Sequence, residues 1–167
     1  MSGFLQNIAS LSKWEIWGDL HGTVAMLSLI LFGAALALYF TLGKFPRAAD
    51  WLRSTLLVLF VDLAVLDILG LFIYVPYRAQ GGPRSFLLSS ETTAWLHKII
   101  FEHKEFLAFA PPILILVAAV VAFLKRQELS TDTTAKRTIL FSLISALIIV
   151  LVVAAEAVLV TKSAPLK

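Results

Sequence analysis

Two of the three histidines in the chain, His97 and His103, lie close together just ahead of a long apolar segment. The third, His21, occupies the same place at the beginning of the first apolar segment. Imidazole is a common ligand for transition metals and for haem iron. If the apolar segments span a membrane in alternating directions, the first and third begin on the same side. The spacing therefore predicts that these rings can meet.

Several carboxyl groups lie within or beside apolar segments, namely those of Asp62, Asp67, Glu105 and Glu156. An ionised side chain at the middle of a span costs about 2.5–3.5 kcal/mol, and such groups usually face a partner or a cavity. Asp62 and Asp67 differ by about 140° of helical rotation, so they do not share a face. Asp67 instead shares a stripe with Gly70 and Tyr74, which leads toward the histidines.

The elements that position these groups are four apolar runs. The chain of 167 residues is 59% hydrophobic with a mean hydropathy of +0.89, which indicates a membrane protein. A span needs roughly 20 apolar residues, and the sequence predicts spans at about 20–42, 53–76, 98–124 and 138–161. The predicted fold is all-α integral membrane: one membrane domain, 1–167, formed by a four-transmembrane-helix antiparallel bundle. Residues 1–18 are predicted to form a short amphipathic helix at the interface.

The connections and their flanks contain residues that commonly cap or interrupt helices. Ser89 or Ser90 is expected to cap the third long helix, and Ser130 or Thr131 the fourth. A double proline, Pro111-Pro112, is expected to kink the third helix and to open room beside His103. Basic residues are denser in the connections after spans one and three, which places those connections in the cytoplasm. We therefore expect the termini and the histidines on the outer face of the cell membrane.

Composition and motifs exclude several kinds of function. The absence of cysteine excludes disulfides, thiolate metal sites, iron–sulfur clusters and covalent haem attachment. The net charge of +3 is explained by loop cations that set topology, so nucleic acid is not an expected partner. No phosphate loop, dinucleotide fingerprint or nucleophile–base pattern is present. An independent hydrolase or transferase is not expected.

The first functional hypothesis is a haem b ligated by His21 and His103, with His97 as the less favoured ligand. Arg78 or Arg84 could pair with the haem propionates, and Tyr74 could donate a hydrogen bond. Asp67, Glu105 and Glu156 are the expected groups for a proton or a quinone. In general architecture only, such a protein resembles small four-helix membrane cytochromes of the b type, which exchange electrons with quinone. It would be a subunit that works with other membrane-protein subunits.

Three alternatives remain open at this point. His21, His103 and nearby carboxylates could form a copper, zinc or iron centre. Asp62, Asp67 and Glu156 could line a proton-linked transport path, although no repeat symmetry of the transporter kind is visible. The chain could also be a structural subunit of a larger respiratory or photosynthetic complex, without its own cofactor or with a histidine bound to chlorophyll.

Overall fold

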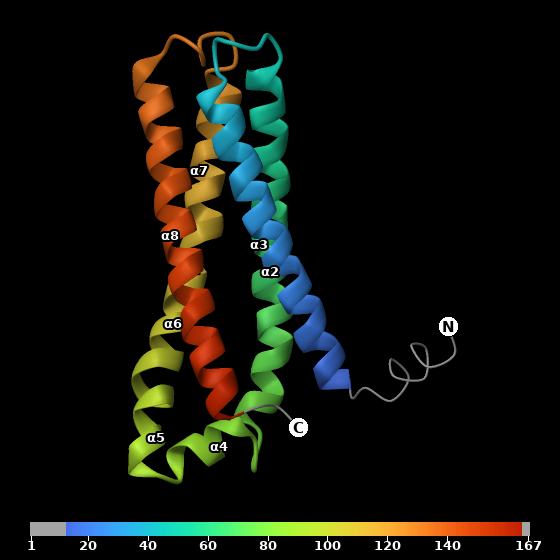
Figure 1. Ribbon diagram of the computed structural model, residues 1–167, viewed down its shortest axis with the longest axis vertical. Helices are drawn as coiled ribbons and strands as arrows, with labels where there is room; N and C mark the ends of the chain where they lie inside the picture. The colour runs from blue at the N-terminus through green and yellow to red at the C-terminus, as the bar shows by residue number, and fades with distance from the viewer. Residues whose placement is uncertain (1–12, 165–167) are drawn as a thin grey trace, which may run out of the picture.

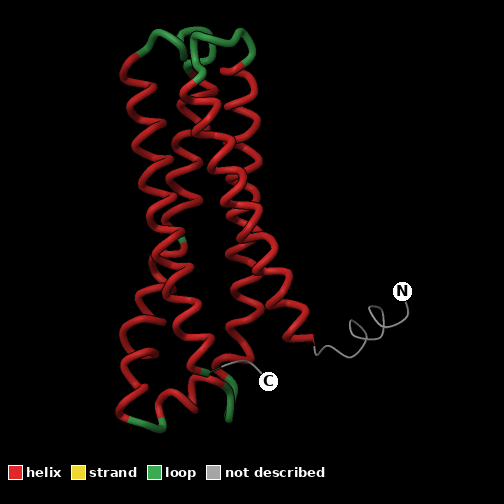
Figure 2. The backbone as a smooth tube through the Cα atoms, in the orientation of Figure 1, coloured by secondary structure: helices red, strands yellow, loops and turns green. Residues whose placement is uncertain are grey.

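The computed structural model describes residues 13–164, and within them all regular structure is helical (Figures 1 and 2). The elements are α2 (Lys13–Phe40), α3 (Ala48–Arg78), α4 (Pro83–Leu88), α5 (Glu91–Trp95), η1 (Leu96–Phe101), α6 (Glu102–Ala108), α7 (Ala110–Leu124) and α8 (Thr133–Ser163). The segment η1 is a π-helix, and α5 to α7 together form the third long helix.

Four of the helical segments are long and apolar enough to cross a membrane: Trp14–Phe40, Ala48–Arg78, Glu91–Leu124 and Thr133–Ser163. Large apolar side chains cover the outside of these segments. Met26, Ile30, Phe106 and Phe141 are each more than 60% exposed. A water-facing surface of that kind would be unfavourable, whereas lipid accepts it without cost. The chain is therefore a multi-pass membrane protein.

The long helices lie side by side, with connections 41–47 and 125–132 at one end and α4 at the other (Figure 1). The α4 end is also where α2 begins and α8 ends. Helix α3 packs against both α2 and α7, and α7 packs against α8. The main core contains Phe32, Leu56, Ile115, Leu143 and their neighbours. A second, smaller core lies at the α4 end and includes Tyr77, Leu87, Leu96 and Phe101.

The structure differs from the expectations at three helix ends. Helix α2 begins by Lys13, so residues 13–18 belong to the first long helix; residues 1–12 of the predicted interfacial helix lie outside the described residues. Ser90 is at the N-cap of α5, but its hydroxyl contacts Thr92 Oγ1 and does not cap the backbone. Asp132, and not Ser130 or Thr131, caps α8 by accepting a hydrogen bond from Ala135 N at 3.0 Å. That bond, together with Lys125, lowers the pKa of the Asp132 carboxyl.

The third long helix is interrupted near the double proline, as predicted. It breaks at Phe109, where α6 ends and α7 begins, and Pro111 and Pro112 are buried in the first turn of α7. Proline is tolerated there because the first N–H groups of a helix have no intrahelical partner. The break separates the polar residues of α6 from the apolar α7.

A tight glycine turn sets the direction of α4. Gly81 has φ of +76°, a left-handed conformation that disfavours other residues. A Cβ on Gly82 would collide with the carbonyl oxygen of Pro76. The turn therefore brings α4 back across the end of the molecule, where Pro83 and Leu87 are buried.

Candidate functional site

His97 is the most completely buried ionisable residue at the α4 end, with 2% of its surface exposed. Its Nδ1 lies 3.0 Å from the hydroxyl of Tyr77 on α3. Its Nε2 accepts a hydrogen bond from Arg84 Nε on α4, also at 3.0 Å. Because Nε2 is an acceptor, the ring is neutral and carries its proton on Nδ1, which donates to Tyr77. His97 therefore links three elements through both of its nitrogens.

Aromatic packing and a π-helical turn hold His97 in this position. The rings of Tyr77 and Phe101 stack with centroids 3.8 Å apart, and His97 lies 5.7 Å from Phe101. His97 is part of η1, the π-helix, whose wider turn changes the direction of its side chains. Such π-turns are rare and are frequent at functional sites. The sequence analysis did not predict this turn.

His103 contacts a carboxylate of the fourth long helix. Its Nδ1 lies 2.8 Å from Glu156 Oε1 on α8. The His103 ring is 55% exposed, whereas Glu156 is only 13% exposed. A carboxylate at Nδ1 fixes the ring and leaves Nε2 as the nitrogen available to a ligand. Two residues further along α6, Glu105 Oε2 pairs with Arg78 Nη2 at 3.4 Å, and Arg78 also lies over the Tyr74 ring.

Lys104 also lies in this region, with its Nζ 4.9 Å from the centre of the Phe101 ring. Its charge is near enough to His21 of α2, Glu105 and Glu156 to influence them electrostatically. Three buried atoms nearby have no hydrogen-bond partner: His21 Nδ1, Glu105 Oε1 and Glu156 Oε2. Buried polar atoms are nearly always satisfied in folded proteins. This concentration of unsatisfied atoms distinguishes the region from an ordinary packed core.

His21 itself packs against α3, close to Gly70. A Cβ built on Gly70 lies 3.6 Å from His21 Cε1. No hydrogen bond or ring contact joins His21 to His103 among the described residues: His21, on α2, packs against α3, whereas His103, on α6, contacts α8. The region thus contains both predicted ligands, each with a different neighbour.

The two aspartates of α3 have different surroundings, as their predicted faces imply. Asp62 is buried, and its Oδ2 accepts a short hydrogen bond from Ser28 Oγ on α2. Asp67 is half-buried and makes no hydrogen bond or ion pair within residues 13–164. Asp62 therefore has a structural role that joins α2 to α3, whereas Asp67 has no partner that explains it.

Replacing Ser28 by Ala is expected to destabilise the protein through Asp62. The buried carboxyl would lose the one side-chain hydrogen bond that it has within residues 13–164, at a cost of about 1–3 kcal/mol. Thermal unfolding in a mild detergent measures the change. The Ser28→Ala/Asp62→Leu double variant should be more stable than Ser28→Ala alone, because it also removes the buried carboxyl that has lost its hydrogen-bond donor. Equal stability of wild type and Ser28→Ala would show that the bond contributes nothing.

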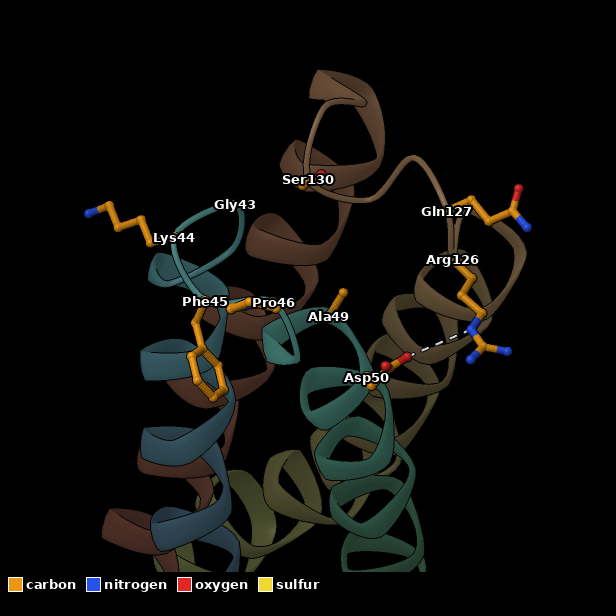
Figure 3. Close-up of a pocket in the computed structure, with 9 residues that line it drawn as sticks. All are labelled: Gly43, Lys44, Phe45, Pro46, Ala49, Asp50, Arg126, Gln127 and Ser130. Atoms are coloured by element: carbon orange, nitrogen blue, oxygen red, sulfur yellow. Dashed lines mark ion pairs between the residues drawn. The ribbon is translucent and has the colours of Figure 1, made fainter.

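A pocket of about 410 Å³ lies at the opposite end of the molecule, between the connections 41–47 and 125–132 (Figure 3). Its walls include Phe45, Pro46 and Asp50, and Arg126 closes one side by pairing with Asp50 at 3.6 Å. Lys44 and Gln127 point away from it. The pocket contains none of the predicted site residues, and we do not assign chemistry to it.

Most of the predicted site residues lie toward the α4 end, but several of their partners were not predicted from the sequence. Ser28, Tyr77, Arg84 and Lys104 each make a defining interaction, although only Arg84 was considered as a ligand-binding group. Residues 13–164 contain no group of three or more His, Asp and Glu side chains that could hold a metal ion. The metal-centre alternative therefore lacks a ligand set in this part of the chain.

No protein-family model matches the sequence, and no curated protein or solved structure is significantly similar to it. Function is therefore inferred from the residues and their geometry alone.

Proposed function

We propose that this protein is a small membrane subunit of an electron-transfer complex, which binds one haem b through His21 and His103 and exchanges electrons with quinone. The observation that carries the proposal is the contact between His103 Nδ1 and Glu156 Oε1 at 2.8 Å. Histidines that ligate metals almost always use their second nitrogen in this way, toward a carboxylate or a carbonyl. The pairing orients His103 for ligation through Nε2.

The two histidines have the chemistry that haem iron requires. His21 has an unsatisfied buried nitrogen and packs beside Gly70 of α3. The His103 ring is more than half exposed. When bound, haem would supply one-electron redox chemistry. His97 is left out of the ligand set, because both of its nitrogens already have partners.

The surrounding residues have supporting roles in this proposal. Arg78 lies at the α4 end beside Tyr74 and Glu105, where a cation can stabilise the propionates of haem. Glu105 and Glu156 each keep a buried oxygen without a partner, so each can accept a proton. Asp67 of α3 has no hydrogen-bond or ion-pair partner among the described residues. It is the third group that we propose to accept and release protons. These groups would exchange protons when a quinone is reduced or oxidised.

A second candidate function follows from Asp67. An acid without a partner in a membrane span usually marks a proton path or a contact with another subunit. With Asp62 and Glu156, it would serve a proton-linked transport component, or an accessory subunit without a cofactor. Asp62 fits this role less well because Ser28 already satisfies it. Reduced and oxidised absorption spectra distinguish the two functions.

We also propose an antiparallel arrangement of the spans in the cell membrane, with both termini and the histidines outside. Seven basic residues lie in or beside the connections after the first and third spans: Lys44, Arg47, Arg53, Lys125, Arg126, Lys136 and Arg137. The other side also carries seven Lys and Arg, but the short connections are the denser in basic residues, and short basic loops favour the cytoplasmic side.

Single cysteines at positions 2 and 130 test this orientation. The natural chain contains no cysteine, so Ser2→Cys and Ser130→Cys each give an unambiguous label. In intact cells, a membrane-impermeant maleimide should label Ser2→Cys and leave Ser130→Cys unreacted until the membrane is opened. The reverse pattern would overturn the proposed orientation.

A further inference from the structure

Arg84 differs from the other arginine at the α4 end in the kind of partner that it has. Arg78 pairs with the carboxylate of Glu105 at 3.4 Å. Arg84 makes no ion pair within residues 13–164; its Nε donates to the neutral His97 ring at 3.0 Å. The imidazole therefore fixes the guanidinium without neutralising its charge.

The hydrogen bond to His97 leaves the two terminal nitrogens of the Arg84 guanidinium available to a ligand. An arginine has five N–H donors in a rigid fork, and two terminal nitrogens can bind an oxyanion bidentately. His97 occupies only Nε. Since His97 is 2% exposed and Tyr77 holds its other nitrogen, the ring cannot rotate freely away from Arg84. Arg84 is thus a charged, pre-oriented donor, and this lowers the entropy cost of binding an anion.

The location of Arg84 indicates where that anion comes from. Helix α4 crosses the end of the molecule between the second and third spans (Figure 1). Phe86 on α4 is 61% exposed and Trp95 on α5 is 45% exposed. Aromatic side chains at the end of a span prefer the headgroup region, where they meet the lipid phosphates. Arg84 lies two residues before Phe86 on α4, and α5 with Trp95 follows directly after it.

We propose that Arg84, oriented by the buried His97 ring, binds the phosphate of an anionic phospholipid headgroup. This goes beyond the proposed electron-transfer function and does not require a haem. Anionic headgroups attract cationic side chains at the membrane surface with about 1 kcal/mol per charge. The bidentate contact adds a charge-assisted hydrogen bond, so removal of Arg84 should weaken headgroup binding about tenfold.

The test is a titration of the detergent-purified full chain with phosphatidylglycerol and, separately, phosphatidylcholine, followed by native mass spectrometry. Wild type should bind phosphatidylglycerol more tightly. Arg84→Gln should weaken this binding about tenfold and abolish the preference between the two lipids. Lys98→Gln is the matched control, because it removes an exposed charge close to His97 and should retain the preference. An excess of inorganic phosphate should not displace the lipid.

Several results would overturn the proposal. Wild-type affinity in Arg84→Gln would show that the guanidinium does not bind the lipid, and an equal loss in Lys98→Gln would show a general effect of charge. Displacement by inorganic phosphate would identify a site for the free anion. If Arg84→Gln lowered haem content and kept the lipid preference, the oxyanion would be a haem propionate.

The Arg84→Lys variant tests the bidentate contact separately. It keeps the positive charge but loses the planar guanidinium, so it should bind phosphatidylglycerol more weakly than wild type.

Discussion

His103→Ala and His21→Ala are each expected to lose the absorption band of reduced haem. In the proposed site both imidazoles would hold the haem, so the loss of either one should release it. Glu156→Gln should have an intermediate effect, because Glu156 Oε1 lies 2.8 Å from His103 Nδ1 and orients the ring. Loss of such an orienting carboxylate typically costs 10–100-fold in metal affinity, so we expect haem affinity to fall by about that factor. Haem content per chain, measured from the reduced spectrum, gives the result.

The His97→Ala variant is the matched control for these substitutions. Both nitrogens of His97 have protein partners, so the folded fraction of this variant should keep its haem. Circular dichroism of each variant separates loss of cofactor from loss of fold. A reduced band that survives in both His21→Ala and His103→Ala would assign the cofactor to other residues.

Replacing His97 by Leu is expected to give the largest loss of stability among single substitutions at the α4 end. The Tyr77 hydroxyl and Arg84 Nε would both lose their partner, and the Tyr77 residue is only 5% exposed. A stranded buried donor or acceptor costs about 1–3 kcal/mol. Because Arg84 can turn toward water, we expect a total loss of about 2–3 kcal/mol in the free energy of unfolding. Unfolding in mixed micelles of mild detergent and dodecyl sulfate measures it.

Two further variants show where that loss comes from. Tyr77→Phe keeps the stack on Phe101 and removes only the hydroxyl, so it should cost about 1 kcal/mol. Lys98→Ala removes an exposed side chain from the same turn and should change stability by less than about 0.5 kcal/mol. If His97→Leu were as stable as Lys98→Ala, the hydrogen bonds of His97 would contribute nothing to the free energy of unfolding.

The number and approximate place of the long helices could be predicted from the sequence because lipid requires long apolar runs. Helix ends were less predictable. Ser130, Thr131 and Asp132 are all good capping residues, and only the packing of α8 decides that Asp132 is used. The beginning of α2 was placed too late because polar residues among Trp14 and Trp17 suit an interfacial segment as well as a helix. The π-helix of η1 has no known sequence signal.

The candidate site was predictable as a group of residues but not as a set of contacts. Hydropathy placed His103 and Glu156 at the same end of their spans, yet their pairing depends on the rotation and depth of α6 against α8. His97 was considered only as a less favoured haem ligand, whereas the structure buries it between Tyr77 and Arg84. A short turn at Gly81 and Gly82 brings Arg84 to it, and sequence spacing alone does not fix that path.

The most direct measurement is the visible absorption spectrum of the wild-type protein, purified with haem supplied and with its partner subunits present. The oxidised sample and the dithionite-reduced sample are compared, and the reduced-minus-oxidised difference is normalised to protein. We predict the difference spectrum of a haem b with two histidine ligands. A colourless protein that is folded by circular dichroism would contradict the electron-transfer function and favour the accessory or proton-linked subunit.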